Sequence, residues 1–165
     1  MPVAETRRID TAFDLDSEAA TAALAGRLAP LAVPGDVIGL WGGLGTGKTV
    51  FARAFIRARG NPDEEVPSPT FTLLQVYDPA AGFSGCVYHF DLYRLSAPED
   101  AHELDIEDAF AEGVSVIEWP DRLGPLLPDE RLDVTLAHGT SPESRRLTLS
   151  GNGGWQARLA EVGLV

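Results

Sequence analysis

One stretch of the chain, from Gly42 to Thr49, has residue types and spacing that suit phosphate binding. It reads Gly-Gly-Leu-Gly-Thr-Gly-Lys-Thr and fits G-x-x-x-x-G-K-[ST], a pattern typical of P-loops that lie between a strand and a helix. An apolar run begins at Val37, and apolar residues recur at helical spacing from Val50 to Arg59. The sequence therefore predicts a phosphate-binding loop in its usual structural context.

The residue types explain how such a loop would work. Glycines leave the backbone N–H groups free to approach phosphate oxygens, and a helix that begins near Lys48 adds unpaired N–H groups and a partial positive charge. Lys48, the only lysine among 13 Lys and Arg residues, would reach the β- and γ-phosphates, and the Thr49 hydroxyl would ligate Mg²⁺. The predicted nucleotide-binding residues are Gly42, Gly43, Leu44, Gly45, Thr46, Gly47, Lys48, Thr49 and Val50.

Two acidic residues stand where apolar runs end, and they are candidates to complete the site. Asp91 closes the run Val-Tyr-His-Phe-Asp, and Glu118 closes Val-Ser-Val-Ile-Glu. A P-loop site needs a carboxylate near its magnesium, usually from the end of a neighbouring strand. The alternatives are that Asp91 pairs with Arg94 and that Glu118 caps a loop. His89 shares a strand face with Asp91 and is equally compatible with a structural or a catalytic role.

The stretch from Ser68 to Phe71 could sense the nucleotide. Prolines would stiffen it, and the Thr70 hydroxyl could reach Mg²⁺ or the γ-phosphate; a capped entry to the next strand is the alternative. The paired residues Arg145 and Arg146 are interpreted as a solvated surface.

The remaining patterns predict one α/β domain over residues 1–165, of the P-loop NTPase type. We expect a three-layer sandwich with a mixed sheet, whose centre is parallel and whose edge strands are antiparallel. A helix capped by Asp16 or Ser17 should precede the P-loop strand. A capping box is predicted at Ser96–Glu99. The other predicted strands are 6–13, 71–77, 86–92, 114–118, 132–137 and 146–149, and the other predicted helices are 96–112 and 155–162.

Composition restricts the class of protein further. The net charge of −12 disfavours autonomous binding to nucleic acid, because phosphates would be repelled at long range. The sequence shows no membrane-spanning stretch and no signal peptide, and its single cysteine, Cys86, leaves no internal disulfide. These features favour a cytoplasmic protein without a membrane partner.

Four motifs together resemble one family, TsaE (also called YjeE), the ATPase of bacterial tRNA threonylcarbamoyladenosine biosynthesis. Besides the P-loop they are Ser68-Pro69-Thr70-Phe71, His89-Phe90-Asp91-Leu92-Tyr93-Arg94 and Ile117-Glu118-Trp119-Pro120. The resemblance covers about residues 36 to 130.

The resemblance implies a protein that binds ATP and Mg²⁺ and hydrolyses ATP slowly when alone. Thr49 and Glu118 would hold Mg²⁺, Lys48, Asp91 and Glu118 would serve hydrolysis, and Ser68 and Thr70 would lie on a switch-like loop. The implied partners are a TsaD-type threonylcarbamoyl transferase and its TsaB-type paralogue, which would bring the only contact with tRNA. ATP turnover would reset this complex, which modifies the adenosine beside the anticodon of tRNAs that read ANN codons.

Three other functions are alternatives to this one. A small-molecule kinase would need an arginine-bearing lid, for which Arg94 and Arg122 are the candidates. A GTPase is disfavoured because its Asn-Lys-x-Asp motif requires a second lysine, which the chain lacks. A nucleotide-gated adaptor without useful turnover would bind ATP only to control docking.

Overall fold

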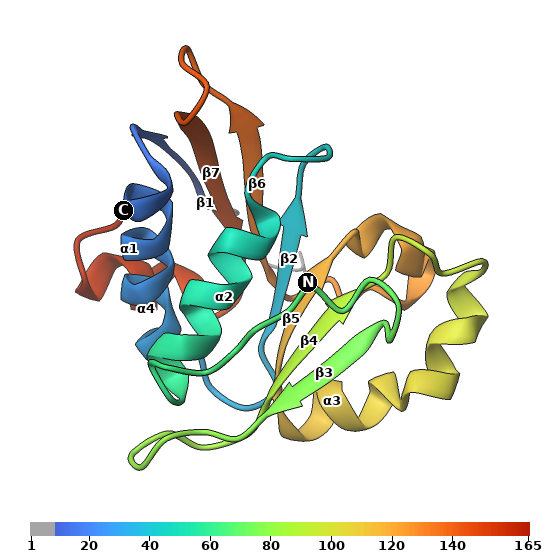
Figure 1. Ribbon diagram of the computed structural model, residues 1–165. Coiled ribbons are helices and arrows are strands. Elements are labelled where there is room, and N and C mark those ends of the chain that lie inside the picture. Colours follow the sequence, from blue (N-terminus) through green and yellow to red (C-terminus); the bar gives the residue numbers. More distant parts are fainter. Residues whose placement is uncertain (1–8) are drawn as a thin grey trace, which may run out of the picture.

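The computed structural model describes residues 9–165, which form one seven-stranded sheet (Figure 1). The strands are β1 (Ile9–Leu15), β2 (Val37–Trp41), β3 (Leu74–Tyr77), β4 (Val87–Asp91), β5 (Val114–Glu118), β6 (Leu132–His138) and β7 (Arg145–Gly151). The α-helices are α1 (Glu18–Leu28), α2 (Lys48–Arg59), α3 (Ile106–Glu112) and α4 (Trp155–Glu161). Short 3₁₀ helices are η1 (Ala29–Leu31), η2 (Pro98–Leu104) and η3 (Pro120–Leu126).

The sheet has the predicted mixed character, with strand order β1-β7-β6-β2-β5-β4-β3. Strands β6, β2, β5 and β4 pair in parallel, whereas β7 and β1 at one edge and β3 at the other pair antiparallel. The fold prediction of an α/β domain with a parallel centre and antiparallel edges is therefore confirmed.

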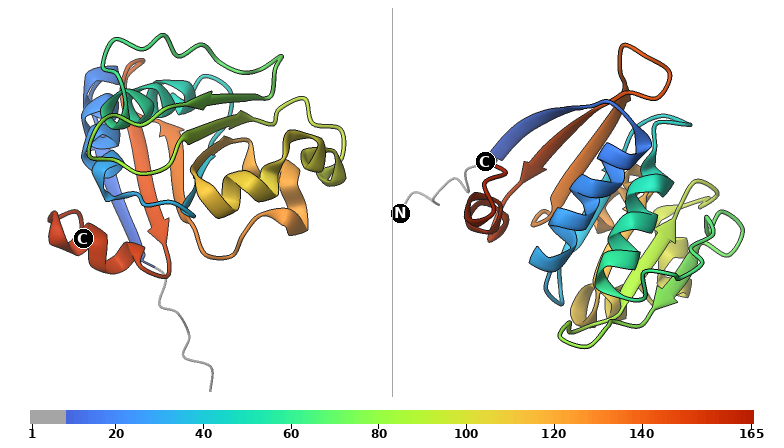
Figure 2. Two further views of the ribbon diagram at one scale, coloured as in Figure 1. Left: turned by 90° about the horizontal axis from the view of Figure 1, so that it is seen from below. Right: turned by 60° about the vertical axis from the view of Figure 1, so that its left-hand side comes forward.

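Helices cover the two faces of the sheet to different extents. Figure 2 shows α1 and α2 side by side on one face, where they share a core with apolar residues of β1, β2, β4, β5, β6 and β7. Tyr77 of β3 packs against this core, and α4 contributes to it. On the other face α3, η2 and η3 pack against β2, β4 and β5. The part of that face formed by β6, β7 and β1 carries polar residues such as Thr135 and Thr148, so the third layer covers only half of the sheet.

Most predicted elements are present, with adjusted ends. Ser17 caps α1 by accepting a hydrogen bond from the Ala20 N–H at 3.2 Å. The predicted strand 6–13 corresponds to β1, and positions 6–8 lie outside the described residues. The helical prediction over 96–112 divides into η2 and α3 at Asp105, whose backbone is left-handed with φ 53°. The other strand and helix predictions match β4 to β7 and α4 within two residues.

Two local predictions were wrong. Ser96 is not the cap of η2: the capping residue is Ala97, whose N–H donates to the Asp100 carboxylate at 3.2 Å. The strand expected from Phe71 begins only at Leu74, because Leu73 has a left-handed φ of 66° and its N–H donates to the Pro69 carbonyl. That turn removes Phe71 from the sheet, although its β-propensity favours a strand.

The register of the parallel strands brings the predicted acids together. Asp91 at the end of β4 is paired in register with Glu118 at the end of β5, and Leu40 of β2 is paired with Glu118 on the other side. The P-loop follows β2 directly, so all three groups lie at the same edge of the sheet. None of the helices within residues 9–165 is long and apolar enough to cross a membrane.

Candidate functional site

The loop between β2 and α2 is shaped by glycines at positions that other residues would not tolerate. Gly42 has φ 142°, and a Cβ there would lie 2.4 Å from the Leu136 carbonyl oxygen and 2.6 Å from Thr46 Oγ1. Gly47 precedes α2 with φ 103° and no side-chain cap. The first N–H groups of α2 therefore remain available to an anion, as a phosphate-binding loop requires.

Lys48 is nearly buried, and its ammonium points back onto the loop. Its Nζ donates to the Gly42 carbonyl at 2.8 Å and to the Gly43 carbonyl at 2.6 Å, and it lies 4.2 Å from the centre of the Trp119 ring. Desolvation by burial lowers the pKa of the Lys48 ammonium, and the negative charges of Glu118, Asp91 and Asp121 oppose that shift. An anionic ligand would add a compensating charge to this partly desolvated cation.

Glu118 is buried and accepts two hydrogen bonds from different elements. Thr49 Oγ1 of α2 donates to Oε1 at 2.9 Å, and Nε2 of His89 on β4 lies 2.7 Å from Oε2. Because a carboxylate only accepts, Nε2 carries the His89 proton. The other ring nitrogen, Nδ1, is buried without a hydrogen-bond partner among the described residues. Glu118 is thus held by this network and does not cap a loop.

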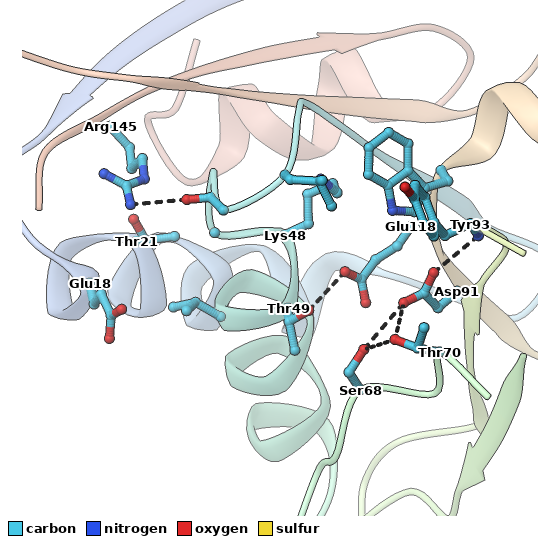
Figure 3. A pocket seen from close by; sticks show the side chains of 15 residues that line it. Glu18, Thr21, Lys48, Thr49, Ser68, Thr70, Asp91, Tyr93, Glu118 and Arg145 are labelled. Atoms are coloured by element: carbon cyan, nitrogen blue, oxygen red, sulfur yellow. Dashed lines mark hydrogen bonds between the residues drawn. The ribbon is translucent and has the colours of Figure 1, made fainter. Parts of the chain in front are cut away.

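Asp91 is held by the loop that precedes β3 (Figure 3). Its Oδ2 accepts hydrogen bonds from Ser68 Oγ at 3.2 Å and Thr70 Oγ1 at 3.1 Å, and its Oδ1 accepts from the Tyr93 N–H at 3.1 Å. Asp91 does not form the alternative ion pair with Arg94 among the described residues, because the Arg94 guanidinium lies over the Phe71 ring at 4.4 Å. Ser68 and Thr70 therefore touch the site through Asp91.

These groups surround one cavity of about 450 Å³. The predicted residues that line it are Leu44, Gly45, Gly47, Lys48, Thr49, Val50, Ser68, Thr70, Asp91 and Glu118. Gly42, Gly43 and Thr46 shape the loop behind it without lining it: Thr46 Oγ1 donates to the Gly43 carbonyl at 2.9 Å. The structure thus brings the predicted set together around a single space that is large enough for a nucleotide.

Five further residues line the cavity that sequence reasoning did not place there: Glu18, Thr21, Tyr93, Trp119 and Arg145. Glu18 and Thr21 belong to the first turn of α1, and no motif marks them. The interpretation of Arg145 as solvated surface was wrong: its guanidinium donates to the Thr46 carbonyl at 3.0 Å and to the Gly45 carbonyl at 3.2 Å. Tyr93 and Trp119 belong to two of the quoted motifs, two residues after Asp91 and one residue after Glu118, and that position was the only signal that could have found them.

Comparison with known proteins gives a consistent family match. Residues 15–147 match the family model described as "Threonylcarbamoyl adenosine biosynthesis protein TsaE". The tRNA threonylcarbamoyladenosine biosynthesis protein TsaE of Rickettsia conorii is 41% identical over 122 residues, which are 74% of this chain and 68% of that protein. The Bacillus subtilis protein of the same name is 34% identical over 142 residues, or 86% of this chain and 85% of that one.

A solved structure shares the fold. The crystal structure of YdiB from Bacillus subtilis superimposes with a TM-score of 0.76 at 27% sequence identity, and the match covers 94% of this chain and 95% of that one. The agreement in fold therefore extends well beyond the motifs.

Proposed function

The chain belongs to the TsaE family of tRNA threonylcarbamoyladenosine biosynthesis proteins, and from this premise we propose that it is the family's Mg²⁺-dependent ATPase subunit. It would bind ATP in the cavity, hydrolyse it slowly alone, and act with a TsaD-type transferase and a TsaB-type paralogue. Turnover would reset this complex between rounds of adenosine modification in ANN-reading tRNAs. The proposal places the chain in the cytoplasm with these partners.

One observation carries the proposal: a P-loop cation, a hydroxyl and two carboxylates from different elements converge on one cavity. Lys48 and Thr49 open α2, while Asp91 and Glu118 end adjacent parallel strands. A connecting turn of glycines would not require these acids, and burying them is costly unless they are paired or bind a cation. The arrangement supports the proposal of a nucleotide-hydrolysing site.

Magnesium suits the oxygen donors that this site offers. Thr49 Oγ1 and Glu118 Oε1 lie 2.9 Å apart at the cavity wall, and hydroxyl and carboxylate oxygens are ligands that Mg²⁺ accepts beside phosphates and water. Within residues 9–165 no group of three or more His, Cys, Asp or Glu side chains could hold a metal alone. This agrees with an ion that arrives with its nucleotide. When bound, Mg²⁺ would neutralise charge on the β- and γ-phosphates.

The positions of the lining residues give the nucleotide a direction. Glu18, Thr21 and Arg145 lie on one side of Lys48, and Glu118 and Asp91 lie on the other (Figure 3). We place the γ-phosphate toward the two carboxylates and the ribose and base toward α1. Lys48 would turn from the Gly42 and Gly43 carbonyls to the phosphates, and Asp91 would orient the attacking water.

Phosphate release measured with and without Mg²⁺, the two partner subunits and tRNA tests this function. We expect slow release that needs Mg²⁺ and changes when the partners are present. Negligible release under every condition, with ATP binding intact, would favour the adaptor. Transfer of labelled γ-phosphate to a metabolite instead of water would favour a kinase. The absence of nucleotide binding would contradict all three functions.

A further inference from the structure

Two arginines of α2 join the helix that opens the phosphate-binding site to the loop that follows it. Nε of Arg53 donates to the Val66 carbonyl at 3.3 Å, and Nε of Arg57 donates to the Glu64 carbonyl at 2.9 Å. Both arginines are half-buried and line a groove between α1 and α2, and neither lines the nucleotide cavity. We call Arg53 and Arg57 the arginine tether.

Few hydrogen bonds hold the loop, which occupies positions 61–70 between α2 and β3. Within residues 9–165, the bonds that join these positions to a helix or a strand are those of the arginine tether and those that Ser68 and Thr70 donate to Asp91. The three prolines of the loop have no N–H to donate. Val66 also packs its side chain into the core. The tether and Val66 therefore fix one part of the loop relative to α2, and Asp91 contacts the other.

The tether continues a row of residues that begins at the nucleotide site. Thr49, Arg53 and Arg57 are spaced four positions apart, so they lie along one face of α2. Because a helix rises about 1.5 Å per residue, Arg53 lies about 6 Å along the axis from Thr49. Thr49 donates to Glu118, whereas the two arginines hold the loop that donates to Asp91. One face of α2 therefore carries connections to both acids.

The two acids differ in how directly α2 holds them. Glu118 accepts a hydrogen bond from α2 itself, through Thr49. Asp91 accepts none from α2 among the described residues: its Oδ2 accepts from the loop and its Oδ1 from the Tyr93 N–H (Figure 3). If the loop moved relative to α2, Asp91 would lose two donors while a nucleotide stayed on the helix. A displacement of about 1 Å can cost about 100-fold in rate.

The chemistry of the tether suits it to hold a backbone in place. A guanidinium directs its N–H groups from a rigid plane, and hydrogen bonds from an ionised donor are stronger than those from a neutral one. The acceptors are backbone carbonyls, so the contacts do not depend on the side chains of the loop. The alternative is that the apolar stems of the arginines only cover the core beneath them.

We propose that the arginine tether positions Asp91 for ATP hydrolysis by holding Ser68 and Thr70 in a fixed place relative to α2. The inference rests on the proposed function, which gives Asp91 the task of orienting the attacking water. The tether does not line the cavity, so it acts on the rate of hydrolysis and not on nucleotide binding. Arg53 and Arg57 are positioning residues in this scheme.

Single-turnover hydrolysis and ATP titration of tether variants test the inference. Arg53→Met keeps an apolar stem and removes the donors, and we expect phosphate release from bound ATP to fall by about tenfold or more. ATP affinity should stay within about twofold of wild type. Arg57→Met should lose less, because its acceptor at position 64 lies further from Ser68 than the acceptor of Arg53 at position 66. The double variant should lose more than either single one.

Two variants separate positioning from packing. Arg53→Lys returns a cationic donor and should recover part of the rate that Arg53→Met loses. Equal losses in these two variants would assign the effect to packing and overturn the inference. Glu64→Ala keeps the carbonyl that Arg57 contacts and should hydrolyse ATP like the wild type. A loss in Glu64→Ala as large as that in Arg57→Met would also count against the carbonyl contact and overturn the inference.

Amide hydrogen exchange of the free protein reports the position of the loop without turnover. The Leu73 N–H donates to the Pro69 carbonyl, and the Tyr93 N–H donates to Asp91 Oδ1. Both amides should exchange about tenfold faster in Arg53→Met than in wild type, while those of β2 and β5 keep their rates and show that the variant is folded. Unchanged exchange of both amides would overturn the inference even if hydrolysis slowed.

The wild type distinguishes this inference from the proposed function. If it releases phosphate and the tether variants release it equally fast, the inference is wrong and the ATPase proposal stands. If the wild type binds ATP without releasing phosphate, the ATPase proposal is wrong and the role of the tether in hydrolysis falls with it. A loss of ATP affinity beyond about tenfold in Arg53→Met would overturn the inference alone, because it would place Arg53 in nucleotide binding.

Discussion

The floor and the rim of the cavity differ in how their polar groups are satisfied. The floor consists of Lys48, Thr49, Asp91 and Glu118, with His89 buried behind Glu118, and its hydrogen bonds come from several elements of the protein. The rim, at the mouth of the cavity, consists of Phe71, Tyr93, Arg94 and Arg122, and its two guanidinium groups lie over the rings of Phe71 and Tyr93. Buried polar groups need partners within the fold, whereas exposed ones can remain available. The floor therefore has its geometry fixed by the fold, whereas the side chains of the rim are exposed to solvent.

Removing the floor cation should give the largest effect. Lys48→Ala deletes the ammonium that would contact the β- and γ-phosphates, and we expect ATP affinity to fall by roughly 100-fold or more, since charge-assisted hydrogen bonds contribute about 1.5–3 kcal/mol each. Isothermal titration with ATP and Mg²⁺ measures this. Arg27→Ala removes a cation far from the cavity and should leave the affinity unchanged. If the Lys48→Ala variant bound ATP normally, the Lys48 ammonium would not be the group that binds the phosphates.

The two floor acids should affect turnover more than binding. Asp91→Ala or Glu118→Ala should lower phosphate release by about 100-fold, which is the scale of losing a positioned catalytic group, while much of the nucleotide binding remains. Single-turnover hydrolysis together with titration separates the two quantities. The isosteric Asp91→Asn and Glu118→Gln variants control for packing. Unchanged turnover in both alanine variants would refute the assignment of these acids.

His89 should act more weakly, as a positioning residue for Glu118. His89→Leu removes the donor to Oε2, and we expect Mg²⁺ affinity to fall by about tenfold, as is typical when a partner of a metal-ligating group is lost. His89→Gln retains an N–H donor and should recover part of that affinity. Electron paramagnetic resonance of Mn²⁺ with ADP measures metal binding without turnover. Equal losses in both variants would point to packing alone.

The smallest effect that we predict separates two neighbouring glycines of the loop. Gly42→Ala should lower the free energy of unfolding by about 1–3 kcal/mol, because a Cβ at φ 142° meets the Leu136 carbonyl. Gly43→Ala is the matched control, since nothing lies within 4 Å of its Cβ position. Urea unfolding of both variants gives the comparison. Similar stabilities would mean that the loop can shift to make room for a Cβ at position 42.

The sequence was most informative where local pattern and strand register coincide. Glycine spacing identified the loop at Gly42–Thr49, and alternation in two apolar runs placed Asp91 and Glu118 at strand ends that parallel pairing then set side by side. Glu18 and Thr21 could not be predicted, because only the packing of α1 beside α2 brings them to the cavity. Arg145 depends in the same way on where β7 meets the loop.

Other differences between the predicted and the observed elements arose where two local preferences competed. The strand-forming residues at Phe71–Leu73 yielded to the turn closed by the Pro69 carbonyl, and adjacent acids made the cap of η2 ambiguous until Asp100 was seen to accept from Ala97. Neither pattern contains the tertiary contact that decides the outcome. The half-covered sheet likewise follows from chain connectivity, which residue composition does not encode.

The solitary lysine has a practical consequence for chemical labelling. Apart from the α-amino group, Lys48 is the only primary amine of the chain, and it lies almost entirely inside the cavity. Acylating reagents would therefore report on a single side chain, and a bound nucleotide should shield it from them. Amine-directed cross-linkers, by contrast, would find almost no attachment point on the outside of this protein, so complexes with it call for carboxyl-directed or photoactivated chemistry.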